Sequence, residues 1–364
     1  MTGTCPVDPA DQVAFLLNVQ RLLGEGSFVA TYKFALLHAL ADLALAEGDD
    51  GGAELRLETP KIAERLVELY WRQAAPHEGG THTHSLVGAG TESPPVRQLL
   101  QNTGRQAAII GHIAEVGMSR SLGRFRRDEP AAWRMLVTKV DATLRKMPLW
   151  KLQTVGSEAV EFLYANDPGQ VATSIVLRPG VAYCLRTYHG LVTALCRGAR
   201  PRFIPRQNRD LEQGNVDLSS FLFGRERESL NEYRQPLLAV QSGECFYCRQ
   251  SMGSEPGQAD HFVPWARYAA DLPHNFVLAH ANCNRHKSDL LAGETHLERW
   301  VERNTVSTGI FVEATSQSVC DAVSRRAHNV ARWAYAQNDA SKLRVWSRGR
   351  QMEVLTGRWR AVLG

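Results

Sequence analysis

The sequence has no apolar run long enough to cross a membrane and no strong excess of either charge. Its most apolar stretch, Val29 to Ala46, is interrupted by Lys33, His38 and Asp42, whereas a spanning helix needs about 20 mostly apolar residues. Lys and Arg exceed Asp and Glu only by 42 to 38, so the chain is not a polybasic nucleic-acid coat. We therefore expect a globular protein with no membrane segment, on which any basic surface is local.

The sequence also lacks the features of a secreted protein. Its first residues, MTGTCPVDPADQ, contain neither the positive region nor the apolar region of a secretory signal, so we expect a cytoplasmic location. Seven cysteines are an odd number in a chain of 364 residues, and a reducing cytosol disfavours a disulfide framework. The length and the 44% hydrophobic content predict two or three domains with substantial cores.

Apolar residues at helical spacing occur along most of the chain. A face running from Trp133 to Met147 predicts a helix entered through Asp128 and Pro130. SIVL at 174–177 predicts a strand, followed by a helix from Pro179 to Gly198. Further helices are predicted at 11–24, 29–46, 61–73, 226–241, 295–302 and 316–338. The predicted domains are an N-terminal helical subdomain at 1–75, a second mainly helical region at 96–225, a small module at 226–300 and a C-terminal helix and tail at 301–364.

Two cysteine-containing pairs in the small module have the spacing of metal knuckles. CFYC supplies Cys245 and Cys248, and HANC supplies His280 and Cys283 after a gap of thirty-one residues. Two such pairs suit tetrahedral zinc, because each pair provides two neighbouring ligands and the loop between them closes the site. We predict a structural Zn²⁺ ion, whereas Cys184 and Cys196 lie in an apolar segment and are expected to be buried as small hydrophobic residues.

Polar residues between and after these pairs follow a characteristic order. Asp260 and His261 stand in ADHFVPW, Asn275 in HNFVLAH, and Asn284 and Lys287 in CNRHK. The order Asp-His, Asn, Asn, Lys over about residues 243–290 resembles the HNH nuclease family, in which many members have a ββα-metal fold on a zinc-bound frame. We therefore expect a predominantly helical α+β protein: a large α-helical N-terminal region, a zinc-stapled ββα-metal HNH module, and a helical, basic C-terminal tail.

The residue types agree with hydrolysis of a phosphodiester. Asp260 offers an anionic oxygen and Asn284 a neutral carbonyl oxygen, a set that suits Mg²⁺ or Mn²⁺. His261 occupies the next position of an extended segment, so its side chain need not share the ion and is the expected general base. The resemblance implies that Asn275 braces the loop that carries His261.

The helix that follows the second pair carries three further candidates. Lys287 lies three residues beyond Asn284, on the same helix face, and is expected to contact phosphate. His280 stands where many zinc-bearing relatives have a cysteine, so it is either a zinc ligand, as we predict, or an active-site imidazole. His286 is either a metal neighbour, a phosphate contact or a solvent-exposed side chain.

The nuclease-like segment is not itself basic, since residues 245–300 carry five Arg and Lys against six acids. Affinity for DNA phosphates must therefore come from neighbouring basic stretches. Residues 197–209 contain five arginines and no acid, and residues 342–360 contain six basic residues and one acid. Either stretch is a nucleic-acid surface or a set of arginines that belongs to the fold. The predicted nucleic-acid contacts are Arg202, Arg206, Arg285, Lys287, Arg348 and Arg350.

The combined pattern predicts a metal-dependent endonuclease that hydrolyses DNA. An HNH module joined to a large helical region resembles bacterial restriction and antiphage defence nucleases, which implies a defence role only by analogy. Two alternatives remain: a zinc-stabilised DNA-binding module without catalysis, and a defence-complex subunit that acts only with a protein partner. The presence of Asp260, His261 and Asn284 disfavours the first alternative.

Overall fold

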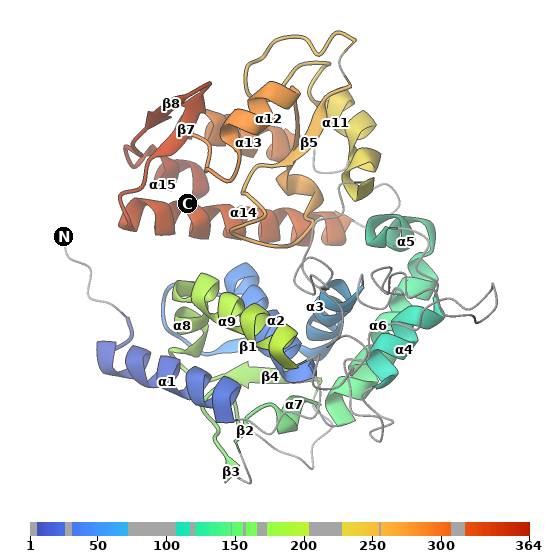
Figure 1. Ribbon diagram of the computed structural model, residues 1–364, viewed down its shortest axis with the longest axis vertical. Coiled ribbons are helices and arrows are strands. Elements are labelled where there is room, and N and C mark those ends of the chain that lie inside the picture. The colour runs from blue at the N-terminus through green and yellow to red at the C-terminus, as the bar shows by residue number, and fades with distance from the viewer. Residues whose placement is uncertain are drawn as a thin grey trace, which may run out of the picture. The chain divides into compact units, whose positions relative to one another are not determined.

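The computed structural model divides the chain into two compact units, residues 1–225 (unit 1) and 226–364 (unit 2) (Figure 1). Within these units it describes residues 6–25, 31–71, 107–116, 121–146, 148–155, 158–165, 173–203, 228–254, 256–306 and 317–364. The protein is predominantly helical with a few short strands, as predicted. None of the helices in these residues is long and apolar enough to span a membrane. The finer four-part division of the chain stays a prediction.

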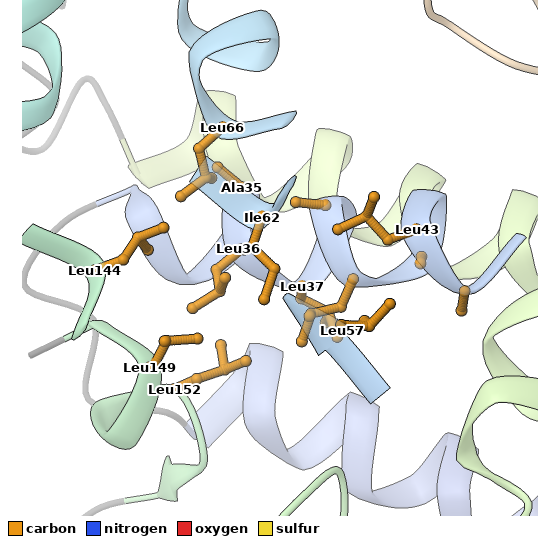
Figure 2. Packing of buried hydrophobic residues seen from close by; sticks show 14 of the residues in the cluster. Ala35, Leu36, Leu37, Leu43, Leu57, Ile62, Leu66, Leu144, Leu149 and Leu152 are labelled. Carbon is orange, nitrogen blue, oxygen red and sulfur yellow. The ribbon is translucent and has the colours of Figure 1, made fainter. Parts of the chain in front are cut away.

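Unit 1 is built around helix α2 (Tyr32–Glu47), whose residues from Tyr32 to Ala46 are all buried. A helix that is apolar on every side has to be enclosed by other elements. Helices α3, α8 and α9 pack against it, and Figure 2 shows leucines of α2 meeting Leu57 of β1, Ile62 of α3 and Leu149 of α7. The elements of this unit are α1 (Pro9–Glu25), α2, β1 (Leu55–Glu58), α3 (Thr59–Tyr70), α4 (Ala107–Glu115), α5 (Leu122–Asp128), α6 (Pro130–Lys146), α7 (Pro148–Lys151), β2 (Thr154–Val155), β3 (Glu158–Ala159), β4 (Ser174–Leu177), α8 (Val181–Thr187) and α9 (His189–Phe203).

Most of the helices expected in unit 1 are present within a few residues of their predicted bounds, and Cys184 and Cys196 are buried. The single helix expected from Pro179 to Gly198 is wrong. The chain instead forms α8 and α9, separated at Tyr188, and α9 continues past Gly198 to Phe203. The predicted strand at 174–177 is β4, and it pairs antiparallel with β1 in the register Leu55 to Leu177. Strand β1 lies more than a hundred residues earlier, and nothing in the sequence around β4 predicts that the two strands pair.

Unit 2 contains a short antiparallel strand pair followed by a helix. Strand β5 (Gln258–His261) pairs with β6 (Phe276–Ala279), and α12 (Ala281–Lys287) follows directly. The helix expected at 226–241 is a 3₁₀ turn, η4 (Glu228–Tyr233), that continues as α11 (Arg234–Val240). The remaining elements are the 3₁₀ turn η5 (Pro273–Asn275), α13 (Glu294–Val306), α14 (Gln317–Ala340), β7 (Val345–Arg348), β8 (Gln351–Glu353) and α15 (Arg358–Leu363). The tail that was predicted to be helical and basic forms a β-hairpin before its helix α15.

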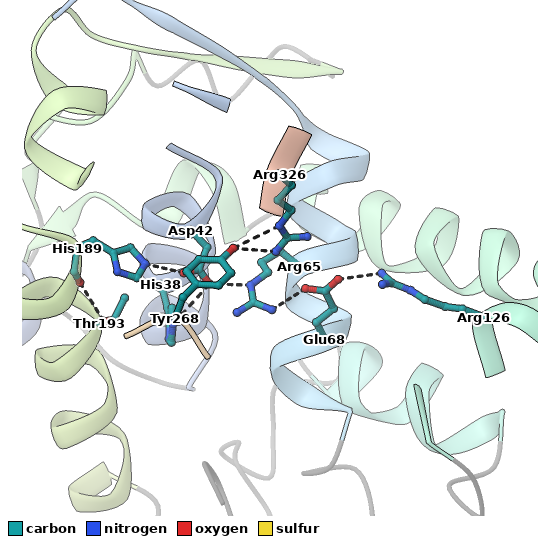
Figure 3. A network of polar contacts seen from close by, with 9 residues as sticks. All are labelled: His38, Asp42, Arg65, Glu68, Arg126, His189, Thr193, Tyr268 and Arg326. Atoms are coloured by element: carbon teal, nitrogen blue, oxygen red, sulfur yellow. Dashed lines mark hydrogen bonds and ion pairs between the residues drawn. The ribbon is translucent and has the colours of Figure 1, made fainter. Parts of the chain in front are cut away.

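A buried carboxylate, Asp42 of α2, is the centre of a polar network in unit 1 (Figure 3). Its Oδ1 lies 2.7 Å from Nε2 of His189, and its Oδ2 lies 2.6 Å from Nε of Arg65. Nε2 of His38, one helical turn earlier, lies 3.5 Å from the same Oδ2, and Arg65 also pairs with Glu68. Because a buried charge is costly unless it is paired, this network favours one placement of α3 and α9 against α2.

Burial and pairing shift the pKa values in this network. Burial acts to raise the pKa of Asp42, but the Arg65 guanidinium and the two imidazoles outweigh it and hold the pKa well below its usual value. Burial lowers the pKa of His38 from 6.5 to about 3, against the opposing attraction of Asp42. As the pH falls below 6.5, His38 takes up a proton only when unfolded, so acid destabilises unit 1. The stabilisation from Asp42 is present above its unfolded pKa of 3.8 and is lost at lower pH.

We expect Asp42→Asn to destabilise unit 1 strongly. The substitution leaves the buried Arg65 guanidinium with less compensating charge, and breaking one side of a buried ion pair costs about 3 to 5 kcal/mol. Hydrogen exchange of α2 and α3 in the full chain at pH 7 measures the change in opening free energy. Asp128→Asn is the matched control, because Asp128 is 51% exposed beside Arg127 and an exposed pair contributes about 1 kcal/mol or less. Equal protection of α2 in Asp42→Asn and wild type would contradict the prediction.

Candidate active site

Four potential metal ligands converge from two places in the ββα segment, before β5 and at the start of α12. Cys245, Cys248, His280 and Cys283 place their ligand atoms within 4.8 Å of one another, a cluster able to hold a zinc ion. Local backbone contacts shape both knuckles: the Cys245 amide donates to the Gln250 carbonyl, and the His280 amide donates to Sγ of Cys245 over 3.4 Å. The two pairs predicted from their spacing are therefore brought together.

The chemistry of these donors fits zinc. Nδ1 of His280 lies 3.4 Å from Sγ of Cys248, while its Nε2 lies 3.3 Å from the Ser251 carbonyl. A proton on Nε2 that is donated to this carbonyl leaves the Nδ1 lone pair directed at the thiols, which is a common arrangement for a metal-binding histidine. Burial and the neighbouring Cys245 and Cys248 thiols raise the pKa of the Cys283 thiol to about 12, so the thiols need a cation beside them to become thiolates together. These contacts favour His280 as a zinc ligand.

Asp260 and His261 are neighbours in strand β5, so their side chains point to opposite faces of the strand. Gln258 and Asp260 share one face, and the Gln258 side chain accepts a hydrogen bond of 2.9 Å from Nδ2 of Asn284 on α12. Gly257, just before the strand, has φ +62, and a Cβ there would lie 2.5 Å from Cε of Met252. The strand thus enters at a glycine-dependent turn and presents Asp260 on the face that receives Asn284.

The Asp260 carboxylate is buried and held by two donors. Tyr247 donates its hydroxyl to Oδ2 over 2.7 Å, and Nζ of Lys287 lies 3.0 Å from the same oxygen. Lys287 also donates to the His261 carbonyl over 2.9 Å, and its side chain is fully buried. The expectation that Lys287 contacts phosphate is therefore not met in this arrangement, because its ammonium is enclosed and has two protein partners. The spacing correctly predicts that Lys287 and Asn284 share one face of the helix. It does not show that this face packs on β5.

His261 is almost fully buried, and it pairs with a residue that the sequence analysis missed. Its Nε2 lies 2.9 Å from Oδ1 of Asp271, whose side chain is 44% exposed. The rings of Trp265 and Phe276 lie edge-on to the imidazole, with centroids 5.3 and 4.8 Å away. A carboxylate partner and ring contacts together fix the orientation of an imidazole. No motif indicated Asp271, which stands in the loop between β5 and β6.

Asn275 connects the two ends of that loop. Its Oδ1 accepts from the Val263 amide over 2.8 Å, and its Nδ2 donates to the Val263 carbonyl over 2.9 Å. The Asn275 carbonyl also accepts from the Phe262 amide. Asn275 is the last residue of η5 rather than part of strand β6. These three hydrogen bonds hold the segment immediately after His261.

The order and geometry of these residues agree with a comparison to known families. Residues 245–292 match the family model described as HNH endonuclease. The match includes both zinc knuckles, β5, β6 and α12, and we call these residues the HNH module. Comparisons of the chain with curated proteins and with solved structures gave no match.

Helix α13 holds the HNH module although it follows the matched residues. Arg299 donates to the carbonyls of Phe246 and Tyr247 in the first knuckle, at 3.0 Å for Phe246. One turn later, Arg303 donates to the carbonyls of Phe276 and His274, at 2.6 and 2.9 Å. Two arginines at i and i+4 therefore bind both the zinc knuckle and the start of β6. The sequence predicts a helix at 295–302, but none of its motifs indicates that this helix contacts the module.

A cavity of about 600 Å³ lies at the Cys3His cluster, on the face of α12 that carries Asn282, Cys283 and His286. Arg299 of α13 and Arg348 of β7 also line it. Its lining residues, all in the described part of unit 2, include no Asp or Glu. The cavity therefore has a basic lining and lies on a different face of α12 from Lys287. His286 therefore lines the cavity, whereas Lys287 contacts Asp260.

The predicted nucleic-acid contacts fall into three groups. Arg285, Arg348 and Arg350 are exposed on α12 and at the β7–β8 hairpin, and Lys287 is buried. Arg206 and the side chain of Arg202 lie outside the described residues. Arg197, from the same arginine-rich stretch, is half-buried near Asp42 in unit 1, where burial lowers its pKa. At least one arginine of that stretch therefore belongs to the fold.

The Asp260 environment also fits a divalent ion. Both donors to this carboxylate use Oδ2, so Oδ1 is the oxygen that Asp260 would offer. The Asn284 amide donates through Nδ2 to Gln258, which leaves its carbonyl oxygen as the metal-binding atom. One carboxylate oxygen and one amide oxygen are ligands that Mg²⁺ and Mn²⁺ accept together with water and phosphate.

We expect Cys248→Ala to lose zinc and to unfold the HNH module. Strands and a helix this short do not enclose a core by themselves, so zinc binding is expected to contribute folding free energy to the module. Elemental analysis should find a zinc ion in wild type and a loss of most zinc in the variant, with fast hydrogen exchange in β5 and β6. Cys184→Ala, which removes a buried cysteine from unit 1, should keep the zinc. Active wild-type protein that contains no zinc would refute the prediction.

Proposed function

We propose that the chain is a metal-dependent endonuclease that hydrolyses DNA phosphodiester bonds. The observation that carries this proposal is the ββα arrangement of Asp260, His261 and Asn284 within an HNH module whose two ends meet at a zinc-type cluster. HNH modules imply DNA as the substrate and generally use a divalent metal. Zinc in the Cys3His cluster would be structural, because four protein ligands leave no coordination site for substrate.

In this proposal the residues divide the chemistry among themselves. Asp260 and Asn284 hold Mg²⁺ or Mn²⁺, which would stabilise the charge that builds on the phosphate. His261, in its neutral form, takes a proton from the attacking water. Asp271 accepts a hydrogen bond from the imidazole and orients it, and Asn275 fixes the backbone that follows it. Lys287 compensates the charge of Asp260 from within the module.

We further propose that exposed arginines beside the HNH module hold the DNA backbone. Arg285 on α12 and Arg348 and Arg350 at the hairpin are exposed, and Arg348 lines the cavity that has no acidic residue. The module itself is close to neutral, so added phosphate affinity depends on such neighbouring charges. The contribution of Arg202 and Arg206 remains a prediction.

A role in restriction or antiphage defence is the finer proposal. It is supported by the resemblance of an HNH module joined to a large helical region to such nucleases, and this support is analogy alone. Unit 1 would then select the substrate, a protein partner or the activation state. The alternative is a defence-complex subunit that cuts only with its partner, and cleavage by the purified chain distinguishes the two.

We expect His261→Ala to abolish most DNA cleavage while the protein stays folded. Loss of a general base lowers the rate of the chemical step by about 10²- to 10⁴-fold. The measurement is cleavage of plasmid and single-stranded DNA by the purified chain in Mn²⁺, with zinc content and circular dichroism confirming the fold. His112→Ala, which removes an imidazole from α4 of unit 1, should cut like wild type. Equal cleavage by His261→Ala and wild type would assign the activity to another site.

We expect the double variant Arg348→Gln, Arg350→Gln to bind DNA more weakly and with a flatter salt dependence. Each lost phosphate contact should reduce the slope of log K against log salt by about 0.9. Binding to a fixed duplex is measured in a salt titration without divalent ions, and zinc content checks the fold. The control is Arg21→Gln, Arg178→Gln, two exposed arginines that already pair with Glu25 and Glu161. Unchanged slopes in the hairpin variant would exclude these arginines from the DNA surface.

A further inference from the structure

Tyr247 connects the zinc site to the carboxylate proposed to hold the catalytic ion. It stands between Cys245 and Cys248 in the first knuckle, and its hydroxyl donates to Oδ2 of Asp260 over 2.7 Å. The second donor to that oxygen, Lys287, ends the helix on which Cys283 lies. Each of the two zinc-binding segments therefore supplies one of the donors that hold Asp260.

We propose that Tyr247 is a positioning residue that sets Asp260 for divalent-ion binding and makes this binding depend on the zinc knuckle. The inference rests on the proposed function, because it takes Asp260 as a ligand of the catalytic ion. Nothing in the motif order pointed to this tyrosine. Its role follows from the contacts of its hydroxyl and ring.

The hydroxyl is fixed in place by the packing of the ring. Tyr247 is 4% exposed, and the rings of Phe246, His296 and Trp346 lie edge-on to it with centroids 5.1 to 5.5 Å away. Arg299 binds the backbone carbonyl of the same residue. With ring and backbone both held, the hydroxyl has little freedom to leave Asp260, and a preorganised donor costs little entropy when the ion binds.

The contact between Tyr247 and Asp260 joins a hydroxyl donor to a carboxylate acceptor. A neutral hydroxyl that donates to a carboxylate forms a charge-assisted hydrogen bond, which is stronger than one between neutral groups. Because this bond and the Lys287 ion pair both use Oδ2, they orient the carboxylate so that Oδ1 is the oxygen left for the ion.

Tyr247→Phe tests the hydroxyl alone, because phenylalanine keeps the ring and its packing. Loss of an outer contact to a metal ligand typically weakens metal binding about 10- to 100-fold. We expect that increase in the Mn²⁺ dissociation constant, measured by electron paramagnetic resonance on the full, zinc-loaded chain without DNA. Zinc content and thermal midpoint should stay close to wild type, a combination that a purely structural role of the hydroxyl would not give. In cleavage assays the Mn²⁺ midpoint should rise by the same factor, and saturating Mn²⁺ should restore most of kcat.

Tyr335→Phe is the matched control. Tyr335 is a fully buried tyrosine of unit 2 whose hydroxyl donates to the Ala292 carbonyl instead of a carboxylate. Its Mn²⁺ affinity should equal that of wild type. Equal Mn²⁺ affinity in Tyr247→Phe and wild type, or equal weakening in both tyrosine variants, would overturn the proposal.

The outcome separates this proposal from the proposed function. If wild type binds Mn²⁺ and Tyr247→Phe binds it about 10-fold less tightly, the positioning role is supported even when neither protein cuts DNA, and only the nuclease proposal fails. If wild type binds no Mn²⁺, or if Asp260→Asn binds it as tightly as wild type, Asp260 is not the ligand and the positioning role is refuted. Cleavage by wild type together with either of these results would leave the nuclease function standing at a different metal site.

Discussion

The convergence of three thiols and one imidazole is the constraint on which the HNH module depends. Strands β5 and β6 and helix α12 are too short to enclose a hydrophobic core of their own. The two knuckles lie before β5 and after β6, so bringing Cys245 and Cys283 together closes the segment at its ends. The residues between Cys245 and Cys283, including Asp260 and His261, then form a segment whose two ends are fixed. A few side-chain contacts within this segment determine the positions of Asp260 and His261.

Those contacts come from three directions. Tyr247 reaches Asp260 from the first knuckle, Lys287 reaches it from α12, and Asn275 holds the chain after His261. Helix α13 adds Arg299 and Arg303, whose guanidinium groups bind backbone carbonyls of the knuckle and of β6. The functional module therefore extends physically to Val306, beyond the residues that carry its family signature.

The sequence alone was sufficient for the parts of this site that depend on residue order. Cysteine and histidine spacing predicted the Cys3His cluster, and the Asp-His, Asn, Asn, Lys order predicted the ββα segment, because both are patterns of residue spacing with few structural solutions. The contacts of Lys287 and the partners Tyr247 and Asp271 were not predictable in the same way. A lysine one turn after Asn284 suits a solvent-facing phosphate contact as well as a buried ion pair, and only the packing of α12 on β5 decides between them.

Unit 1 shows the same division between local and long-range information. The mostly apolar sequence of α2 indicated a helix, and polar residues such as its Lys33, His38 and Asp42 need partners when they are buried. Two of them find partners in distant elements: His189, which pairs with Asp42, is far along the chain from it, and Lys33 donates to the Thr154 carbonyl. Strand β4 was likewise predictable from its own residues, whereas its pairing with β1 was not, because β-pairing between segments so far apart leaves no periodicity in either one.

The distribution of arginines narrows where DNA affinity can arise. The number of arginines in a stretch of sequence does not distinguish those that bind DNA from those that stabilise the fold. A guanidinium group has several donors and is also well suited to binding buried carbonyls and carboxylates. Arg186 in unit 1 and Arg299 and Arg303 in unit 2 bind backbone carbonyls, and Arg65 pairs with Asp42. Arginines used in this way cannot release counterions from a phosphate backbone. Among the described arginines predicted to contact DNA, the exposed ones flank α12 and the β7–β8 hairpin, which concentrates the candidate DNA surface around the HNH module rather than over the basic stretches as wholes.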